Sequence, residues 1–559
     1  MFGVFQMFGI SYPFWILMGC LRFVFETIHE LRESHHGRSL LHLTVACLGG
    51  VGVSLSLFLL FLLTFGPFDA MLTTEETFLS LALALLIIWL GCTTLGSYLA
   101  TRIYIDNPYA VAGLVGFGSI VSGIVLLVLA GIEFVFTGEA LFWEGVWIIV
   151  TVLASFLGGH MAYALNALER ERASARKAKA KAARVQPEEV AVLIAAHNEA
   201  LTIESTVMSI LQNTSAKHIY IASDGSTDDT VKIARSLGCT AEDIQPNRGK
   251  ARALTYMLKT HNLYERYKAV LIMDADLKIA PDYFKRTLPQ FDDPETAAIV
   301  GRAVPHWPTH YLPRWDMLFT AYRVQLWRVL QFTIRYGQTW RPMNVTPIIP
   351  GGSSIYRTSV LRKIDIDVPD LIIEDFNMTF EVHHKRLGKI AYCPYAIVID
   401  QEPYSLHDFH RQISRWYLGF WQTVRRHGIW FSFFWTTMAI FAVELIIASL
   451  ISLALPFLLL LYGATKIFDA PIPGEFLVSN MTLYTIIVSV FVLDYLITIF
   501  ITVLERKPLL LVYAFGFFPL RYLEAIVFMR TMITGLFVPP SADGRWKSPA
   551  RIAYAEKAS

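Results

Sequence analysis

Four apolar segments in the first third of the chain are each long enough to cross a lipid bilayer. They lie at about residues 41–65, 78–100, 110–136 and 145–165. A membrane-spanning helix needs about 20 apolar residues to cross the hydrocarbon core. Two further runs follow at about residues 431–462 and 481–504. The sequence therefore predicts four transmembrane helices within residues 41–168 and two within residues 429–508.

Basic residues orient these predicted spans. The loops at 66–77 and 136–140 contain no Lys or Arg, whereas the alternate loops do, and the linker at 169–189 is densely basic. Basic loops stay on the cytoplasmic side, so the chain after residue 183 is predicted to be cytoplasmic. No aromatic residue is interleaved with the basic run. We therefore interpret it as a solvated flank and expect no nucleic-acid partner.

The two ends of the chain are not typical of plain spans. Residues 1–40 combine apolar and charged positions and predict an interfacial segment, with an extra N-terminal span as the alternative. Residues 509–538 contain three charged residues, Arg521, Glu524 and Arg530. Charges at mid-bilayer are costly, so an interfacial or re-entrant helix is expected there. Residues 539–559 form a C-terminal tail.

Between residues 190 and 428 the pattern changes to that of a soluble domain. The short apolar runs VAVLIAA, HIYIAS and AVLIMD predict strands, and segments with helical spacing follow the first two. This alternation predicts an α/β domain, with a mostly parallel sheet and helices on both faces. In such sheets, ligands bind beyond the carboxyl ends of the strands.

Each predicted strand ends in polar residues. The first is followed by His197 and Glu199, the second ends at Asp224, and the third ends at Asp274 and Asp276. Asp and Ser after a strand also cap helices, so the second group has two interpretations. Two carboxylates one residue apart in an extended chain point to the same side and repel each other. A cation between them removes this repulsion, and Mg²⁺ bound by carboxylates and substrate phosphates is the usual arrangement.

Three further motifs offer groups for an anionic ligand or for proton transfer. Lys250 begins a predicted helix, where its ammonium and the helix N-terminus suit a diphosphate, unless the lysine is merely solvated. Gly351 and Gly352 allow close approach of a ligand or form a simple turn. Glu374 and Asp375 open an amphipathic helix, either as helix-stabilising charges or with one of them as a general base.

Seven motifs, AHNE, SDGS, GK, DAD, GGS, IED and QISRW, occur in this order before the last apolar runs. Together they resemble the inverting, membrane-embedded family-2 glycosyltransferases, such as hyaluronan, chitin, cellulose and poly-N-acetylglucosamine synthases. The resemblance extends over about residues 190–421 and depends on the order of the motifs rather than on any single one. It implies a GT-A-like cytoplasmic domain, at residues 190–428, inserted between transmembrane helices.

The resemblance also implies how a sugar nucleotide is held. The pocket for the uridine of a UDP-sugar would be lined by Ala195, His197, Glu199 and Asp224. Lys250 would lie close to the nucleotide. A divalent ion, Mg²⁺ or Mn²⁺, and the UDP diphosphate would be held by Asp274 and Asp276, with Asp276 as the direct ligand.

Catalysis and acceptor binding are implied for the remaining motifs. Asp375, with Glu374 beside it, would be the general base, and Ile373 replaces the threonine that usually precedes this pair. Little effect of Ile373 is expected, because the carboxylate carries the proton. The QxxRW element would consist of Gln412, Arg415 and Trp416. Trp416 offers a flat face to a sugar and Arg415 a charge to the diphosphate, although an interfacial Trp/Arg belt is the alternative.

Other segments are expected to contact the acceptor or to gate the site. These are Gly351 and Gly352, the Trp- and Arg-rich region 306–344, and Trp546 and Arg551 in the tail, for which a disordered basic tail is the alternative. The expected function is processive synthesis of a β-linked polysaccharide from a UDP-sugar, with export through a multi-pass plasma (inner) membrane protein. The expected partners are the donor, the growing glycan and the bilayer. Transfer of a single sugar to a lipid acceptor and a sugar-nucleotide-binding transporter are the alternatives.

Overall fold

The structure is a computed structural model of the 559-residue chain, and it separates into two compact units. One unit is Leu21–Lys179, and the other comprises Met1–Cys20 and Ala180–Ser559. The structure describes residues 47–54, 89–102, 108–129, 147–148, 151–159, 161–162, 185–307, 315–369, 371–468, 494–495, 497–499, 501–502 and 505–538. The predicted segment 1–40, residues 169–184 of the basic linker, and the tail with Trp546 and Arg551 lie outside these residues.

The described helices of the first unit overlap the four predicted spans, and two of them extend two residues beyond. They comprise residues 47–54, 89–102, 151–159 and α4, Pro108–Leu129. Small residues bring their backbones together: a Cβ on Gly50 would lie 2.8 Å from the Ala100 Cβ, and one on Gly158 would lie 2.0 Å from the Thr94 carbonyl oxygen. Such close packing through glycine is common between membrane helices. That these helices cross a membrane stays a prediction.

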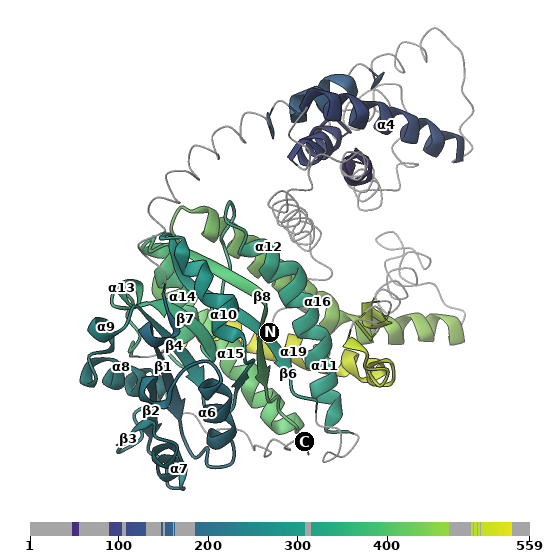
Figure 1. The fold of residues 1–559 in the computed structure, drawn as a ribbon. Helices are drawn as coiled ribbons and strands as arrows, with labels where there is room; N and C mark the ends of the chain where they lie inside the picture. Colours follow the sequence, from purple (N-terminus) through teal and green to yellow (C-terminus); the bar gives the residue numbers. More distant parts are fainter. Residues whose placement is uncertain are drawn as a thin grey trace. The chain divides into compact units, whose positions relative to one another are not determined.

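A mixed eight-stranded sheet organises the described part of the second unit (Figure 1). Its spatial order is β3 Thr240–Ile244, β2 Ile219–Asp224, β1 Val190–Ala196, β4 Ala269–Asp274, β7 Ser353–Arg357, β6 Thr296–Pro305, β8 Lys389–Asp400 and β5 Lys278–Ile279. Strands β3, β2, β1 and β4 are parallel, but β7 pairs antiparallel with both β4 and β6. Strand β8 pairs parallel with β6 and antiparallel with β5. The expectation of a mostly parallel sheet is therefore correct for the first half and wrong for the second.

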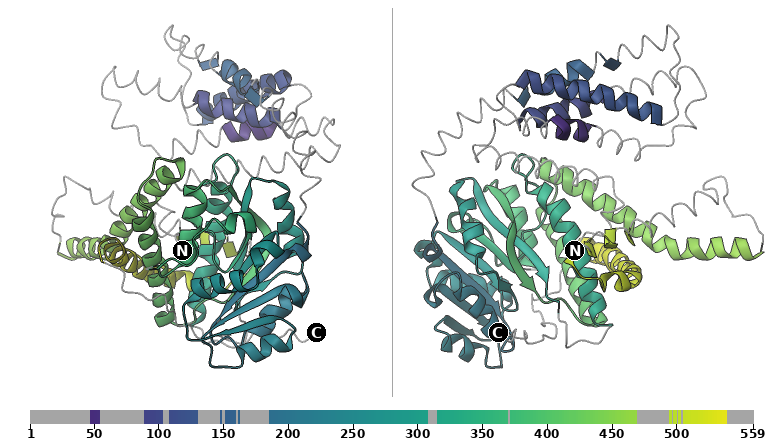
Figure 2. Two further views of the ribbon diagram at one scale, coloured as in Figure 1. Left: turned by 90° about the vertical axis from the view of Figure 1, so that its left-hand side faces the viewer. Right: turned by 45° about the vertical axis from the view of Figure 1, so that its right-hand side comes forward.

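Helices cover both faces of this sheet, as predicted (Figure 2). One core contains Val192 and Ile194 of β1 with residues of α6 Ile203–Leu211, α7 Thr230–Ser236 and α10 Tyr283–Thr287. The other contains Ala191 and Leu193 with residues of α8 Lys250–Thr260, α9 Leu263–Arg266, α13 Thr358–Leu361 and α14 Glu374–His384. Neighbouring residues of β1 thus enter opposite cores, which explains why the whole strand is apolar.

A third core joins the sheet domain to long apolar helices. Its residues come from α11 Met317–Val329, α14, α15 Leu406–His427, α16 Phe433–Phe468, α18 Leu510–Tyr513 and α19 Phe517–Phe537. A π-helical segment, Leu330–Arg335, and α12, Tyr336–Gln338, continue α11. Ser405 caps the start of α15: its Oγ accepts a hydrogen bond from the Asp408 amide at 3.1 Å, and the helix ends before Gly428.

Two helices among the described residues are long and apolar enough to cross a membrane, Phe433–Phe457 and Leu510–Phe537. The first coincides with a predicted span, but the second lies where an interfacial or re-entrant helix is expected. That expectation rested on Arg521, Glu524 and Arg530. Arg521 and Glu524 are only 5% and 1% exposed and lie against protein, whereas Arg530 is exposed, so the interfacial or re-entrant helix stays a prediction. Glu524 accepts a hydrogen bond from the Tyr322 hydroxyl at 2.8 Å, and Arg521 forms an ion pair with Asp494. Arg521 and Glu524 thus have protein partners inside the helix packing.

Candidate functional site

A cavity of about 290 Å³ lies at the carboxyl ends of β1, β2 and β4. The structure places every predicted site residue that it describes in the wall of this one cavity: Ala195, His197, Glu199, Asp224, Lys250, Asp274, Asp276, Gly351, Gly352, Glu374, Asp375, Gln412, Arg415 and Trp416. They come from strand ends, from the N-termini of α8 and α14, and from α15. The roles of the individual side chains stay predictions.

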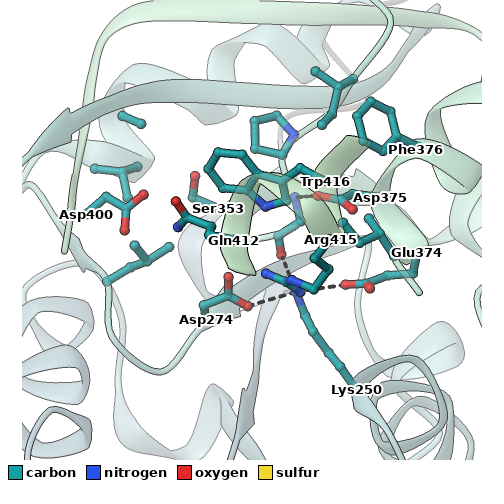
Figure 3. A pocket seen from close by; sticks show the side chains of 18 of the residues that line it. Lys250, Asp274, Ser353, Glu374, Asp375, Phe376, Asp400, Gln412, Arg415 and Trp416 are labelled. Atoms are coloured by element: carbon teal, nitrogen blue, oxygen red, sulfur yellow. Dashed lines mark hydrogen bonds and ion pairs between the residues drawn. The ribbon is translucent and has the colours of Figure 1, made fainter. Parts of the chain in front are cut away.

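Lys250 lies among the acidic residues of the cavity (Figure 3). Its Nζ is 2.8 Å from Asp274 Oδ1 and 2.8 Å from Glu374 Oε1, and it lies 3.5 Å from the Gly351 carbonyl oxygen. Gly249, with φ of 91°, precedes Lys250 and starts α8 at this point. Lys250 is therefore paired within the cavity, and the alternative of a merely solvated lysine is wrong. Asp274, the first aspartate of the DAD motif, is thus paired with the ammonium of Lys250.

Burial and neighbouring charge act together on Asp375. Burial raises the pKa of its carboxyl, Glu374 adds to the rise, and Lys250, the Gly351 amide and Arg415 oppose it, which leaves the pKa at about 6. The Gly351 amide donates to Asp375 Oδ2 at 3.0 Å. Burial alone would lower the pKa of Lys250, but Asp274, Glu374 and Asp375 raise it, so Lys250 stays charged. The cavity thus holds a fixed cation next to a carboxylate that can exchange a proton near neutral pH.

The two glycines of GGS lie against the charged groups of the cavity. A Cβ on Gly351 would lie 3.2 Å from each of Asp375 Oδ2, Glu374 Oε1 and Lys250 Nζ. A Cβ on Gly352 would lie 2.9 Å from Asp274 Oδ2. A side chain at either position would therefore crowd the charged ends of these groups.

Asp224 supports the loop before α8 instead of capping the helix that follows β2. Its Oδ1 and Oδ2 accept hydrogen bonds from the amides of Arg248 and Gly249, both at 2.7 Å. His197 Nδ1 lies 2.7 Å from the Asp224 carbonyl oxygen, which also accepts a hydrogen bond from Asn247 Nδ2 at 3.1 Å. Asp224 thereby fixes the position at which Lys250 enters the cavity.

Asp274 and Asp276 offer the oxygen ligands that a divalent ion requires. Both line the cavity; the Asp274 side chain is 40% exposed, whereas Asp276 is 5% exposed. Among the described residues, no group of three or more His, Cys, Asp or Glu could hold a metal. The donor set fits an ion that takes two carboxylates from the protein and its other oxygens from a bound diphosphate and water.

The far wall of the cavity comes partly from α11 and the π-helical segment. Trp327, Gln331, Arg335 and Gln338 line it, together with Asn247 and Asp400. None of these was singled out individually from the sequence, although acceptor contacts are expected somewhere in region 306–344. Of these, Trp327, Gln331 and Arg335 recur at intervals of four, the spacing of one helix face, and this pattern could have identified these three. The Trp327 and Trp416 rings lie 6.0 Å apart.

Comparisons with known proteins find similar sequences and a similar solved fold. A poly-beta-1,6-N-acetyl-D-glucosamine synthase from Staphylococcus aureus is 27% identical to this chain over 238 residues, which are 42% of this chain and 54% of that protein. The synthase of the same name from Staphylococcus epidermidis is 25% identical over 254 residues, which are 43% of this chain and 58% of that protein. The chain thus spans a little over half the length of these curated relatives. A solved mannosyltransferase from Pyrobaculum calidifontis, in complex with GDP-Man and Mn²⁺, is 16% identical with a TM-score of 0.41, covering 67% of this chain and 97% of that one.

The part of the chain that builds the sheet and most of the cavity matches one family model. Residues 187–419 match the model described as "Glycosyltransferase like family 2". This range contains all seven motifs from which the resemblance was stated. The family-2 part of the resemblance is therefore confirmed, and residues 187–419 are a glycosyltransferase family 2 domain with a GT-A-like α/β fold.

Proposed function

We propose that the protein transfers sugars from a UDP-sugar to a growing β-linked polysaccharide on the cytoplasmic side and passes the product across the membrane. One observation carries this proposal: a single cavity contains the paired aspartates, Lys250, the Asp375 carboxylate and Trp416. The curated relatives are named as synthases of a polysaccharide, which supports a polymer as product.

Asp375 would act as the general base of a direct displacement. The Gly351 amide holds one oxygen of its carboxylate, and the other would take the proton of the acceptor hydroxyl. The hydroxyl oxygen then attacks the anomeric carbon, the bond from that carbon to the diphosphate breaks, and UDP leaves from the opposite side. An α-linked donor therefore yields a β-linked product. A pKa of about 6 suits this role, because the base is mostly ionised at pH 7 yet still basic enough to take a proton.

Lys250, and a divalent ion held by Asp274 and Asp276, would offset the charge of the departing diphosphate. Asp274 and Asp276 would hold Mg²⁺ or Mn²⁺, which supplies Lewis-acid charge to the diphosphate when bound. Lys250 already lies 2.8 Å from Asp274 Oδ1, so its ammonium is available at the same place. Arg415, on α15, brings a second fixed cation into the cavity wall. Fixed charges of this kind stabilise a leaving group without reorganisation during the reaction.

The cavity also reaches a helix that could cross the membrane. Phe441 of α16 lines it along with Trp416, and α16 contains the candidate span Phe433–Phe457. A sugar on the face of Trp416 would thus be close to an apolar helix that could border an exit path. The same proximity would serve a lipid acceptor, so the length of the product decides between the two.

The length of the product tests this proposal. Incubation of the purified protein in detergent with labelled UDP-sugars is expected to yield chains of many residues, resolved by gel electrophoresis. A ladder that grows while short intermediates stay rare indicates processive extension. A product limited to one added sugar that partitions into organic solvent would support the lipid-acceptor alternative and overturn synthesis of a polymer.

Removal of divalent ions is expected to abolish UDP release. EDTA should reduce the rate to background, and added Mg²⁺ or Mn²⁺ should restore it, because the carboxylates of Asp274 and Asp276 cannot themselves offset the diphosphate charge and the bound ion must do so. Asp276→Asn should require a higher ion concentration for half-maximal rate, measured by titration. Asp367→Asn, which alters a surface ion pair with Arg252 outside the cavity, is the control. A rate insensitive to EDTA would contradict the metal assignment.

A further inference from the structure

We propose that Arg323 positions the acceptor-binding side chains Trp416 and Gln412 and connects them to helix α19. The inference rests on the proposed function, because it assigns a purpose to Trp416 that only sugar transfer gives it. Arg323 lies on α11 and is 0% exposed, and it does not line the cavity. It therefore acts through its neighbours and is a positioning residue.

The guanidinium of Arg323 contacts both ends of the QxxRW element. Arg323 Nη2 donates to Gln412 Oε1 at 3.0 Å, and Cζ lies 4.8 Å from the ring centroid of Trp416. The rings of Trp327 and Phe409 lie 5.4 and 4.8 Å from the same Cζ. A planar cation between aromatic faces is held by cation–π attraction, and it fixes the rings in turn. Lysine lacks the planar fork, so it cannot replace arginine in this arrangement.

Two buried carboxylates lie within ion-pair distance of Arg323. Glu402 Oε2 lies 3.4 Å from Nε, and Glu524 Oε1 lies 3.9 Å from Nη1; both side chains are 1% exposed. Each carboxylate also accepts a hydrogen bond, Glu402 from the Trp327 indole at 2.5 Å and Glu524 from the Tyr322 hydroxyl at 2.8 Å. Charged side chains are almost never fully buried unless they are paired, so this cluster requires all its members.

The cluster connects the cavity to a candidate membrane span. Glu402 follows β8, Arg323 lies on α11, Gln412 and Trp416 lie on α15, and Glu524 lies on α19, within the candidate span Leu510–Phe537. Glu524 is the carboxylate that α19 contributes to Arg323, and Arg323 in turn contacts the ring of Trp416. A shift of α19 along its axis would therefore change the contacts that hold this ring. The position of the sugar-binding ring is therefore set partly from within the membrane helices.

Arg323→Lys in the full chain tests this inference by separating acceptor from donor effects. The variant keeps the positive charge, so Glu402 and Glu524 stay compensated, but the fork beneath Trp416 is lost. We expect about a tenfold rise in KM for an acceptor oligosaccharide, with KM for the UDP-sugar and the UDP released by hydrolysis near wild-type values. Arg328→Lys, on the same helix and paired with Glu505 at 3.2 Å, is the matched control. A proportional fall in all rates, with unchanged KM values, would indicate a merely structural arginine and overturn the inference.

A spectroscopic measurement tests the inference without turnover. In protein labelled with 5-fluorotryptophan, the ¹⁹F resonance of Trp416 is identified by its loss in Trp416→Phe. It is expected to shift or broaden in Arg323→Lys and to stay unchanged in Arg328→Lys. The triple variant R323M/E402Q/E524Q, which removes all three charges together, should perturb it in the same way if Arg323→Lys folds poorly. An unperturbed Trp416 resonance overturns the inference, whereas failure of the wild type to use any UDP-sugar overturns the proposed function alone.

Discussion

Replacement of Asp375 by Asn is expected to lower the rate of sugar transfer by about 10²- to 10⁴-fold, the usual contribution of a general base. The amide has nearly the same shape as the carboxylate and can still accept the hydrogen bond from the Gly351 amide, which is 3.0 Å from Asp375 Oδ2. It cannot, however, take a proton from the acceptor hydroxyl. The loss is therefore expected in kcat, with the cavity intact.

Binding of UDP should separate this loss from misfolding. Isothermal titration of Asp375→Asn with UDP and Mg²⁺ is expected to give an affinity near that of the wild type, because Asp224, Lys250 and Asp276 remain in place. Asp367→Asn, at an exposed ion pair with Arg252, should keep both transfer and UDP binding. Transfer by Asp375→Asn at more than about a tenth of the wild-type rate would exclude Asp375 as the base.

Replacement of Lys250 by Gln is expected to move the acid limb of the pH–rate profile to higher pH. Burial raises the pKa of Asp375 to about 6, and Asp375 must lose its proton to act as a base. The wild-type kcat/KM should therefore rise as the pH increases through about 6. Lys250 opposes the rise in the pKa of Asp375. Without its ammonium the pKa of Asp375 climbs further, and each additional unit lowers the ionised fraction about tenfold at a pH below the new pKa. The diphosphate also loses a cation, so the rate at pH 7 falls for two reasons.

A comparison of profiles between pH 5 and 9 distinguishes these two losses. Lys250→Gln should show both a displaced limb and a lower plateau. Lys250→Arg keeps a positive charge near Asp274 and Glu374, and its limb should stay close to that of the wild type. If the limb of Lys250→Gln coincides with that of the wild type, then the charge coupling between Lys250 and Asp375 does not govern catalysis.

The first half of the fold could be predicted because its signals are local. Strands β1, β2 and β4 are short buried apolar runs, and α8 and α14 begin at Lys250 and Glu374, where a preceding glycine or an acidic first turn marks a helix start. The second half depends on distant pairing. Strand β7 pairs antiparallel with β4, so that Ser353 lies opposite Met273, and no local pattern encodes this reversal. The mixed sheet was missed for that reason.

The membership of the site could be predicted, but its contacts could not. Motif order identified residues that do line one cavity, because strand ends and helix starts converge there. The same motifs gave no reason to expect that Asp224 binds two loop amides or that Lys250 bridges Asp274 and Glu374. Arg323 was missed because a lone arginine in a helix is ordinarily exposed, and its carboxylate partners are distant in sequence.

The most direct measurement is UDP release by the purified full chain in detergent, with a panel of UDP-sugars, for the wild type and Asp375→Asn side by side. At least one UDP-sugar should give metal-dependent release by the wild type, stimulated by an acceptor oligosaccharide, with the stimulated rate lost in the variant. Absence of release from every UDP-sugar, or equal stimulated release by Asp375→Asn, would contradict a cavity built for sugar transfer.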